Sequence, residues 1–274
     1  MAETLGVEQR GKYYEEAGVV RDMFQNHMLQ LLCLIGMESP VAFEADAVRD
    51  ETAKLLRAIR PLPLDDIDQW AVRGQYGAGR IDGQPVNAYR AEPNVAPDST
   101  TPTFAALKLR LDNWRWDGVP FYLRSGKRLP RKLTEIAVRF KRTPHLMFRP
   151  LREGALTRNT LVFNIQPDEG IALTFEVKQP GGEVRTRSVD MHFDYDALFG
   201  EPPESYEALL LDCMQGDQML FVRADWVEFA WGFIMPLLEA WAAHPPADFP
   251  NYAAGTWGPP AADVLIGNRR WRNH

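Results

Sequence analysis

The sequence lacks the glycine-rich signatures that nucleotide enzymes commonly carry. It contains no G-x-G-x-x-G after a strand pattern and no P-loop. Gly77, Ala78 and Gly79 are followed by no helix pattern, which favours a simple turn over a dinucleotide fingerprint. No serine lies in a nucleophile-elbow pattern. We therefore expect no Rossmann domain within these 274 residues.

Cysteine and histidine are scarce and scattered. The two cysteines, Cys33 and Cys213, lie in apolar, helix-like surroundings, so we expect buried free thiols in a reducing compartment rather than a disulfide framework. The five histidines show no ligand spacing of the kind that zinc sites have. The sequence therefore predicts no metal centre.

Long apolar runs and an excess of positive charge are also missing. No run approaches the roughly 20 apolar residues that span a bilayer, and the first residues show no signal-peptide pattern. The net charge is −6, so the basic footprint of a nucleic-acid-binding protein is absent. We expect a cytoplasmic protein with no membrane and no nucleic-acid partner.

The hydrophobic patterns change along the chain from helical to strand-like and back to helical. They predict helices over about 18–37 and 44–60, strands between 70 and 195, and helices again over 204–217, 223–243 and in the tail. Few helical stretches separate the strands, which favours antiparallel pairing. We expect one α+β domain over 1–274, with a large, mainly antiparallel sheet and helices packed on one face.

His27 lies in the first predicted helix, close to Asp22. At 100° per residue the two side chains would be roughly 140° apart, with His27 towards the apolar side near Met23 and Leu31. Spacing alone therefore favours a core or boundary histidine. A general base is the alternative, and it would need a carboxylate from another segment to hold the ring.

A basic turn follows one of the predicted strands. The segment 123–132 carries five cations: Arg124, Lys127, Arg128, Arg131 and Lys132. A solvated turn is the simpler interpretation. In an acidic chain, however, such a cluster can attract an anionic substrate, and a lysine ammonium suits a phosphate or a sugar hydroxyl.

Acidic and aromatic residues offer weaker candidates. Glu3 and the neighbouring acids Glu8, Glu15 and Glu16 fit a charged surface, and sequence distance cannot identify a glycosidase pair. Trp114 and Trp116, at alternate positions of a predicted strand, would face one side. Core or interface packing is the simpler role for them, and a sugar-stacking platform is the alternative.

Several stretches together resemble glucose-6-phosphate dehydrogenase. They are RGKYYEEAGVVRDMFQNHMLQLL, VRGQYG, STTPTFAALKLRLDNWRWDGVPFYLRSGKRL, VFNIQPDEGI and YEALLLDCMQGDQMLFVRADWVEFAW. The resemblance is to the C-terminal domain of that family and runs from about residue 2 to the end. The R-D-M-x-Q-N-H and W-D-G-V-P-F-x-L-R-x-G-K stretches are each quite specific.

The resemblance implies roles for five residues in an enzyme of the oxidative pentose phosphate pathway, which oxidises glucose 6-phosphate to 6-phosphogluconolactone. His27 corresponds to the general base that takes the proton of the C1 hydroxyl. The residues that correspond to substrate contacts are Glu3, Asp22, Lys127 and Lys132. These roles suit an imidazole, carboxylates and lysines. The family's homodimer through the sheet implies the same here.

The resemblance also implies NADP as the hydride acceptor, bound mainly by a Rossmann domain outside these residues. In the family, an aspartate of that other part orients the catalytic histidine. We therefore expect the isolated chain to be inactive. Two basic positions of a second, structural NADP site are Leu133 and Ala137 here. A non-catalytic sugar-phosphate-binding or dimerisation module is the alternative function, and a glycoside-acting enzyme with paired carboxylates is a third.

Overall fold

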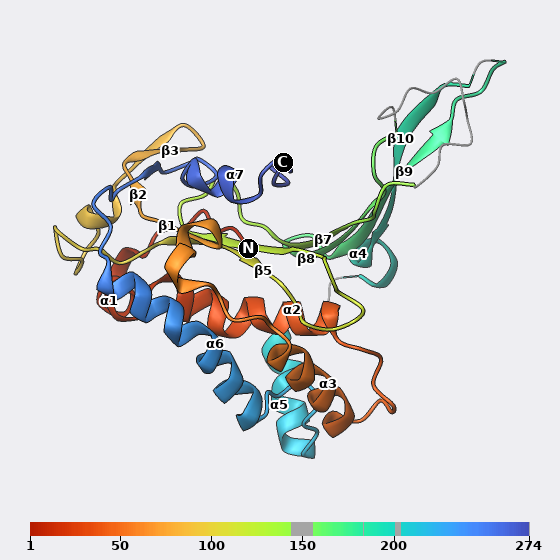
Figure 1. Cartoon of the computed structure of the whole chain (residues 1–274), viewed down its shortest axis with the longest axis horizontal. Helices are drawn as coiled ribbons and strands as arrows, with labels where there is room; N and C mark the ends of the chain where they lie inside the picture. Colours follow the sequence, from red (N-terminus) through yellow and green to blue (C-terminus); the bar gives the residue numbers. More distant parts are fainter. Residues whose placement is uncertain (144–155, 183, 201–203, 274) are drawn as a thin grey trace. The chain divides into compact units, whose positions relative to one another are not determined.

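The computed structural model describes residues 1–143, 156–182, 184–200 and 204–273 (Figure 1). His145 and His274 lie outside these residues. Contacts divide the chain into two compact units, each described by itself below. The first unit comprises Met1–Lys132 with Ser205–His274, and the second comprises Leu133–Glu204.

The first unit begins and ends with helices. Their bounds are α1 Gly11–Val19, the π-helix η2 Val20–Met28, α2 Leu29–Gly36, α3 Ala45–Arg57, α5 Ser205–Gln215, α6 Ala224–Ala243 and α7 Ala261–Leu265, with short 3-10 turns η1 Glu8–Arg10, η3 Leu64–Gln69 and η4 Tyr89–Ala91. The helix predicted over 18–37 thus starts earlier, at Gly11, and is not α-helical throughout. Gly18 interrupts α1 with a φ of 60°, a conformation that glycine adopts without steric cost.

A three-stranded antiparallel sheet forms the centre of the first unit. Its strands are β1 Ala71–Gly74, β5 Phe104–Leu109 and β6 Phe121–Gly126, in the order β1-β5-β6. Two small pairings accompany it: β2 Tyr76–Gly77 runs parallel to β11 Tyr252–Ala253, and β3 Gly79–Ile81 pairs with β4 Gln84–Val86.

The second unit contains a four-stranded antiparallel sheet. It orders β10 Thr186–Asp194, β9 Gly170–Lys178, β8 Thr160–Gln166 and β7 Thr134–Arg139, and α4 Tyr195–Phe199 follows β10. The predicted α+β class and the antiparallel pairing of the long strands are confirmed. The parallel pair β2–β11 is too short for hydrophobic patterning to find.

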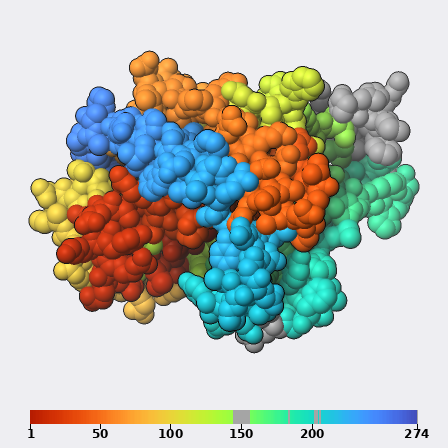
Figure 2. All heavy atoms as spheres, turned by 90° about the horizontal axis from the view of Figure 1, so that it is seen from below, coloured from red at the N-terminus to blue at the C-terminus, as the bar shows by residue number. Residues whose placement is uncertain are grey.

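Helices of the first unit cover one side of its sheet. Figure 1 shows α1, α2, α3 and α6 on that side and the short α7 on the other. In Figure 2 the N-terminal segment lies beside α6, and α5 lies beside α3. Fully buried side chains fill the space between the layers: Phe24, Leu29, Phe104, Leu107, Ile234 and Leu237. The burial of these apolar surfaces is the main stabilising contribution to the unit.

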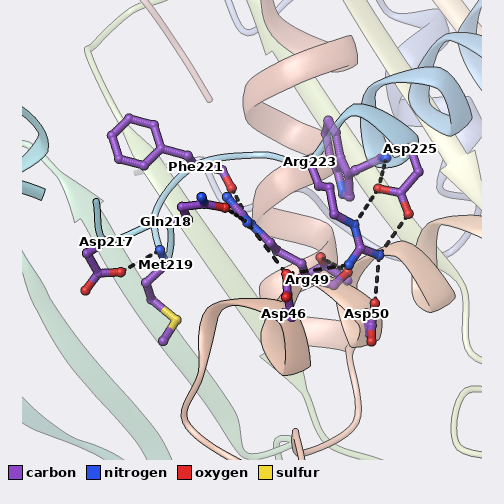
Figure 3. A network of polar contacts seen from close by, with 11 residues as sticks. Asp46, Arg49, Asp50, Asp217, Gln218, Met219, Phe221, Arg223 and Asp225 are labelled. Carbon is purple, nitrogen blue, oxygen red and sulfur yellow. Dashed lines mark hydrogen bonds and ion pairs between the residues drawn. The ribbon is translucent and has the colours of Figure 1, made fainter. Parts of the chain in front are cut away.

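An arginine network joins α3 to the segment that leads into α6 (Figure 3). The Arg49 guanidinium donates to the Phe221 carbonyl at 2.9 Å and to Oε1 of Gln218 at 2.6 Å. Arg223 pairs with Asp50 at 2.7 Å and with Asp225 at 2.8 Å. Two segments far apart in the sequence are thereby held together.

The prediction that Trp114 and Trp116 lie on one strand is wrong. Residues 114–118 form a turn, because Gly118 takes a positive φ of 71° before β6 begins. Trp114 is fully exposed, whereas the Trp116 indole donates to the Gly36 carbonyl at 2.8 Å. The two rings therefore make no shared platform. In the described part of the chain, none of the helices combines the length and apolar character needed to cross a membrane.

The two cysteines differ in exposure, which corrects the expectation that both are buried. Cys33 is buried, whereas Cys213 is exposed on α5, because the predicted apolar surroundings of Cys213 are themselves largely exposed. Burial raises the pKa of the Cys33 thiol to about 12. Desolvation disfavours the thiolate, and the thiolate is the form that reacts.

We predict that a thiol reagent at pH 8 modifies Cys213 quickly and Cys33 only as fast as the fold opens. Ellman's reagent with mass mapping measures both rates, and the urea-unfolded chain is the control in which both thiols react alike. Equal fast rates in the folded chain would contradict the burial of Cys33.

Candidate functional site

The N-terminal segment carries Glu3 to the end of β6. The Glu3 amide donates to the Gly126 carbonyl at 3.1 Å, and the Leu129 amide donates to the Glu3 carbonyl at 2.9 Å. These bonds bring the Glu3 carboxylate to the side chain that follows β6. Nζ of Lys127 donates to Oε2 of Glu3 at 2.8 Å.

Lys127 is the buried centre of this site. It is only 7% exposed, although lysine is almost never fully buried without a partner. Two carboxylates compensate its charge: Glu3 at 2.8 Å and Asp22 Oδ2 at 3.9 Å. The structure thus brings together three of the substrate-binding residues that the resemblance implied.

Asp22 belongs to the π-helix η2. Its Oδ1 accepts a hydrogen bond from the Tyr13 hydroxyl at 3.1 Å, and its Oδ2 faces Lys127. Partial burial and the Asp22 carboxylate raise the pKa of the Tyr13 phenol. The phenol therefore stays a hydrogen-bond donor at neutral pH.

His27 lies on the same π-helix, five residues after Asp22. At its end, the Leu29 amide donates to the carbonyls of Phe24 and Asn26, and the bond to Phe24 is the i→i+5 bond of a π-helix. In a π-helix, two residues five positions apart, such as Asp22 and His27, are separated by about one turn. The separation of roughly 140° predicted for Asp22 and His27 is therefore wrong, because it assumed α-helical geometry.

The side chain of His27 is exposed. This corrects the interpretation of His27 as a core or boundary histidine on the apolar side. The burial of Met23, Phe24 and Met28 instead places the apolar side of η2 elsewhere. π-helical segments within helices are often found at functional sites.

The remaining cations of the basic turn have different environments. Lys132 and Arg131 are exposed, and among the described residues no contact joins Lys132 to the carboxylates around Lys127. The Arg124 guanidinium stacks on Trp257 and Trp271, at 5.0 and 4.6 Å from their centroids. The interpretation of 123–132 as a uniformly solvated turn is therefore wrong.

Arg128 forms a second buried ion pair beside the site. Its Nη2 contacts Oε1 of Glu92 at 3.2 Å, and both side chains are largely buried. The same Glu92 oxygen accepts a bond from the Tyr76 hydroxyl at 3.1 Å. Arg128 adopts a positive φ of 55°, so this pairing holds the chain in a strained conformation directly after Lys127.

Sequence reasoning missed Tyr13, Tyr14 and Glu92. Tyr13 and Tyr14 are adjacent, with one exposed and one buried, so neither stands out in a hydrophobic pattern. Glu92 lies in a turn region without periodicity. No group of histidine, cysteine and acidic residues able to hold a metal ion occurs in the described ranges.

We predict that Glu92→Ala lowers the free energy of unfolding by about 3 kcal/mol, because it leaves the buried Arg128 charge without its nearest partner. Urea denaturation followed by circular dichroism measures the change. The matched control is Asp112→Ala, which removes the exposed pair with Arg60 and should leave the midpoint almost unchanged, since solvent screens that pair. Equal midpoints for both variants would contradict the structural role of Glu92.

Comparisons with known proteins identify the family. The family model described as glucose-6-phosphate dehydrogenase, C-terminal domain, matches residues 1–272. The glucose-6-phosphate 1-dehydrogenase of Aggregatibacter actinomycetemcomitans is 48% identical over 274 residues, which are 99% of this chain and 54% of the relative. That of Bacillus subtilis is 45% identical over 268 residues, with coverage of 97% and 54%.

Solved structures identify the same family. A glucose-6-phosphate dehydrogenase in complex with its substrate glucose 6-phosphate superposes with a TM-score of 0.87 at 34% identity, over 100% of this chain and 55% of that chain. The enzyme from Mycobacterium avium gives 0.79 at 37% identity, with the same coverage. The chain thus spans about half the length of the relatives it matches. It belongs to the glucose-6-phosphate dehydrogenase family and corresponds to its C-terminal domain.

Proposed function

We propose that this chain is the substrate-binding portion of an NADP-dependent glucose-6-phosphate dehydrogenase. The observation that carries the proposal is the buried Lys127 held between the carboxylates of Glu3 and Asp22, in a member of this family. The enzyme would oxidise the C1 hydroxyl of glucose 6-phosphate to give 6-phosphogluconolactone.

Lys127 retains binding capacity for such a substrate. Its ammonium has three N–H donors, and Glu3 takes one of them. The carboxylates of Glu3 and Asp22 can accept bonds from sugar hydroxyls, and the exposed Lys132 adds positive charge for an anionic ligand. The site thus offers both signs of charge, as a phosphorylated sugar requires.

His27 is the proposed general base. Its side chain is exposed and can reach a ligand, and a neutral imidazole has one nitrogen able to take the C1 proton near pH 7. Asp22 is less suited to orient this ring, because its Oδ1 accepts the Tyr13 hydroxyl and its Oδ2 faces Lys127. We assign Asp22 to the sugar, and the orienting carboxylate to the part of the relatives that this chain does not span.

The described residues do not fit the main NADP site. Their one parallel strand pair, β2–β11, joins two-residue strands, and no glycine-rich strand-to-helix turn follows to hold a pyrophosphate. We assign the hydride acceptor to the part outside this chain. The isolated chain would then bind substrate without oxidising it.

We further propose a cytoplasmic homodimer that assembles through the sheet. In the second unit, apolar side chains on β10 and α4 are exposed: Met191, Tyr195, Leu198 and Phe199. Exposed apolar groups of this kind favour association with a second copy. The net charge of −6 supports neither a nucleic acid nor an acidic membrane surface as a partner.

We predict that glucose 6-phosphate raises the melting temperature of the 274-residue chain, because a ligand that binds only the native state stabilises it. Lys127→Ala should abolish the shift. The matched control is Lys54→Ala, which removes an exposed lysine paired with Glu51 and should retain the shift. A wild-type chain that shows no shift at millimolar ligand would overturn substrate binding by this portion.

We predict that the chain reduces NADP with glucose 6-phosphate once joined to the portion of the relatives that it does not span. His27→Ala should then lower kcat by about 10²- to 10⁴-fold, as expected for loss of a general base. His244→Ala, which removes another exposed histidine, serves as the control. Full activity without His27 would overturn its role, and binding without any activity would favour the non-catalytic module.

A further inference from the structure

We propose that Tyr13 and Tyr14, adjacent in α1, are positioning residues that keep Asp22 and Lys127 from closing into a direct ion pair. Their effect is to hold both charged groups open to a ligand. The identity of that ligand as a phosphorylated sugar rests on the proposed function, whereas the positioning itself rests on contacts within the first unit.

The separation of Asp22 and Lys127 is the feature to be explained. Oδ2 and Nζ are 3.9 Å apart, whereas a charge-assisted hydrogen bond between such groups measures about 2.7–2.9 Å. Both side chains are largely buried, and attraction between opposite charges is stronger there than in water. Other contacts must therefore hold the two groups apart.

Tyr13 holds Asp22. Its hydroxyl donates to Oδ1 at 3.1 Å, and the Arg10 guanidinium lies over its ring at 4.8 Å from the centroid. Tyr13 is itself substantially exposed, so this stacking, rather than core packing, orients the phenol. The hydrogen bond turns one carboxylate oxygen away from Lys127.

Tyr14 holds Lys127. The ammonium lies over the Tyr14 ring, with Nζ 5.1 Å from the centroid, within the range of a cation–π attraction. The ring is only 2% exposed and packs edge-on against Tyr89, which in turn packs against Tyr76. These contacts fix the ring, and the ring fixes the ammonium.

The backbone of Lys127 is restrained as well. The Tyr252 hydroxyl donates to the Lys127 carbonyl at 2.8 Å, and the Lys127 amide donates to the Thr103 carbonyl at 3.0 Å. Glu3 holds the ammonium from another direction at 2.8 Å. Lys127 is thus restrained at its amide, its carbonyl and its ammonium. A movement of the ammonium towards Asp22 would weaken its hydrogen bond to Glu3.

The hydroxyl of Tyr14 plays no part in this arrangement. It is buried and has no hydrogen-bond partner among the described residues, although buried tyrosine hydroxyls usually find one. The ring alone therefore accounts for the contact with Lys127. This separates the positioning role of the ring from any role of the hydroxyl and provides a matched control variant.

The separated pair of Lys127 and Asp22 can bind a ligand group that accepts one hydrogen bond and donates another. A ligand hydroxyl oxygen could lie within hydrogen-bond distance of both Nζ and Oδ2 across their 3.9 Å separation. It would accept from the ammonium and donate to the carboxylate. A closed ion pair would have to be broken before it could do the same.

The test compares Tyr13→Phe, Tyr14→Leu and Tyr14→Phe in the 274-residue chain. Calorimetric titration with glucose 6-phosphate should show binding about tenfold weaker for the first two, and within twofold of wild type for Tyr14→Phe, which keeps the ring. Wild-type affinity in both Tyr13→Phe and Tyr14→Leu, or equal loss in Tyr14→Leu and Tyr14→Phe, would overturn the proposal.

A measurement without ligand separates this proposal from the proposed function. The ring of Tyr14 should shift the ε-methylene NMR signal of Lys127 upfield, a shift that Tyr14→Phe keeps and Tyr14→Leu loses. In Tyr13→Phe, which alters an exposed residue, closure of the Asp22 pair should slow exchange of the Lys127 ammonium protons. Absence of both effects would overturn the positioning role even if the chain binds glucose 6-phosphate, and their presence in a chain that does not bind it would overturn only the proposed function.

Discussion

The arrangement of the site depends on compensation of one buried lysine charge. An ammonium taken out of water is costly unless it is paired and hydrogen-bonded. Lys127 meets this requirement with Glu3 from the N-terminal segment, Asp22 from η2 and the ring of Tyr14 from α1. Each of these three partners lies on a different segment of the chain, so the fold has to bring the three segments together around Lys127. This requirement accounts for the pairing of the first residues with the end of β6 and for the interruption of α1 at Gly18, shortly before η2 begins.

The secondary structure was largely predictable where one periodicity dominates. The long strands alternate apolar and polar residues, or carry continuous apolar runs, so their positions were found. The helix over 18–37 was only partly right. Apolar spacing does not distinguish i→i+4 from i→i+5 bonding, so the π-helix Val20–Met28 was missed, and with it the true relation of Asp22 to His27. Trp114 was placed in a strand because the turn ahead of β6 is rich in aromatic residues.

For the candidate site, the resemblance to the family supplied a list of residues, and the sequence could not supply their geometry. Nothing in spacing joins Glu3 to Lys127 across 124 residues, and only the resemblance to the family selected them from many charged residues. Burial was the missing quantity: the same basic turn contains the buried Lys127 and the exposed Lys132. The assignment of Asp22 to the sugar rather than to His27 now rests on its contacts with Tyr13 and Lys127, and no longer on an angle.

The pairing of β2 with β11 has a consequence for the order in which the protein matures. Through Tyr252, a strand close to the C-terminus supplies the hydrogen bond that restrains the carbonyl of Lys127. The Gly255 amide likewise donates to the Arg128 carbonyl. Contacts between distant parts of a sequence form late, because the intervening chain must first be ordered. During synthesis, Lys127 therefore reaches its final environment only after residues 252–255 have left the ribosome, and a product ending before residue 252 would carry the site residues without these contacts.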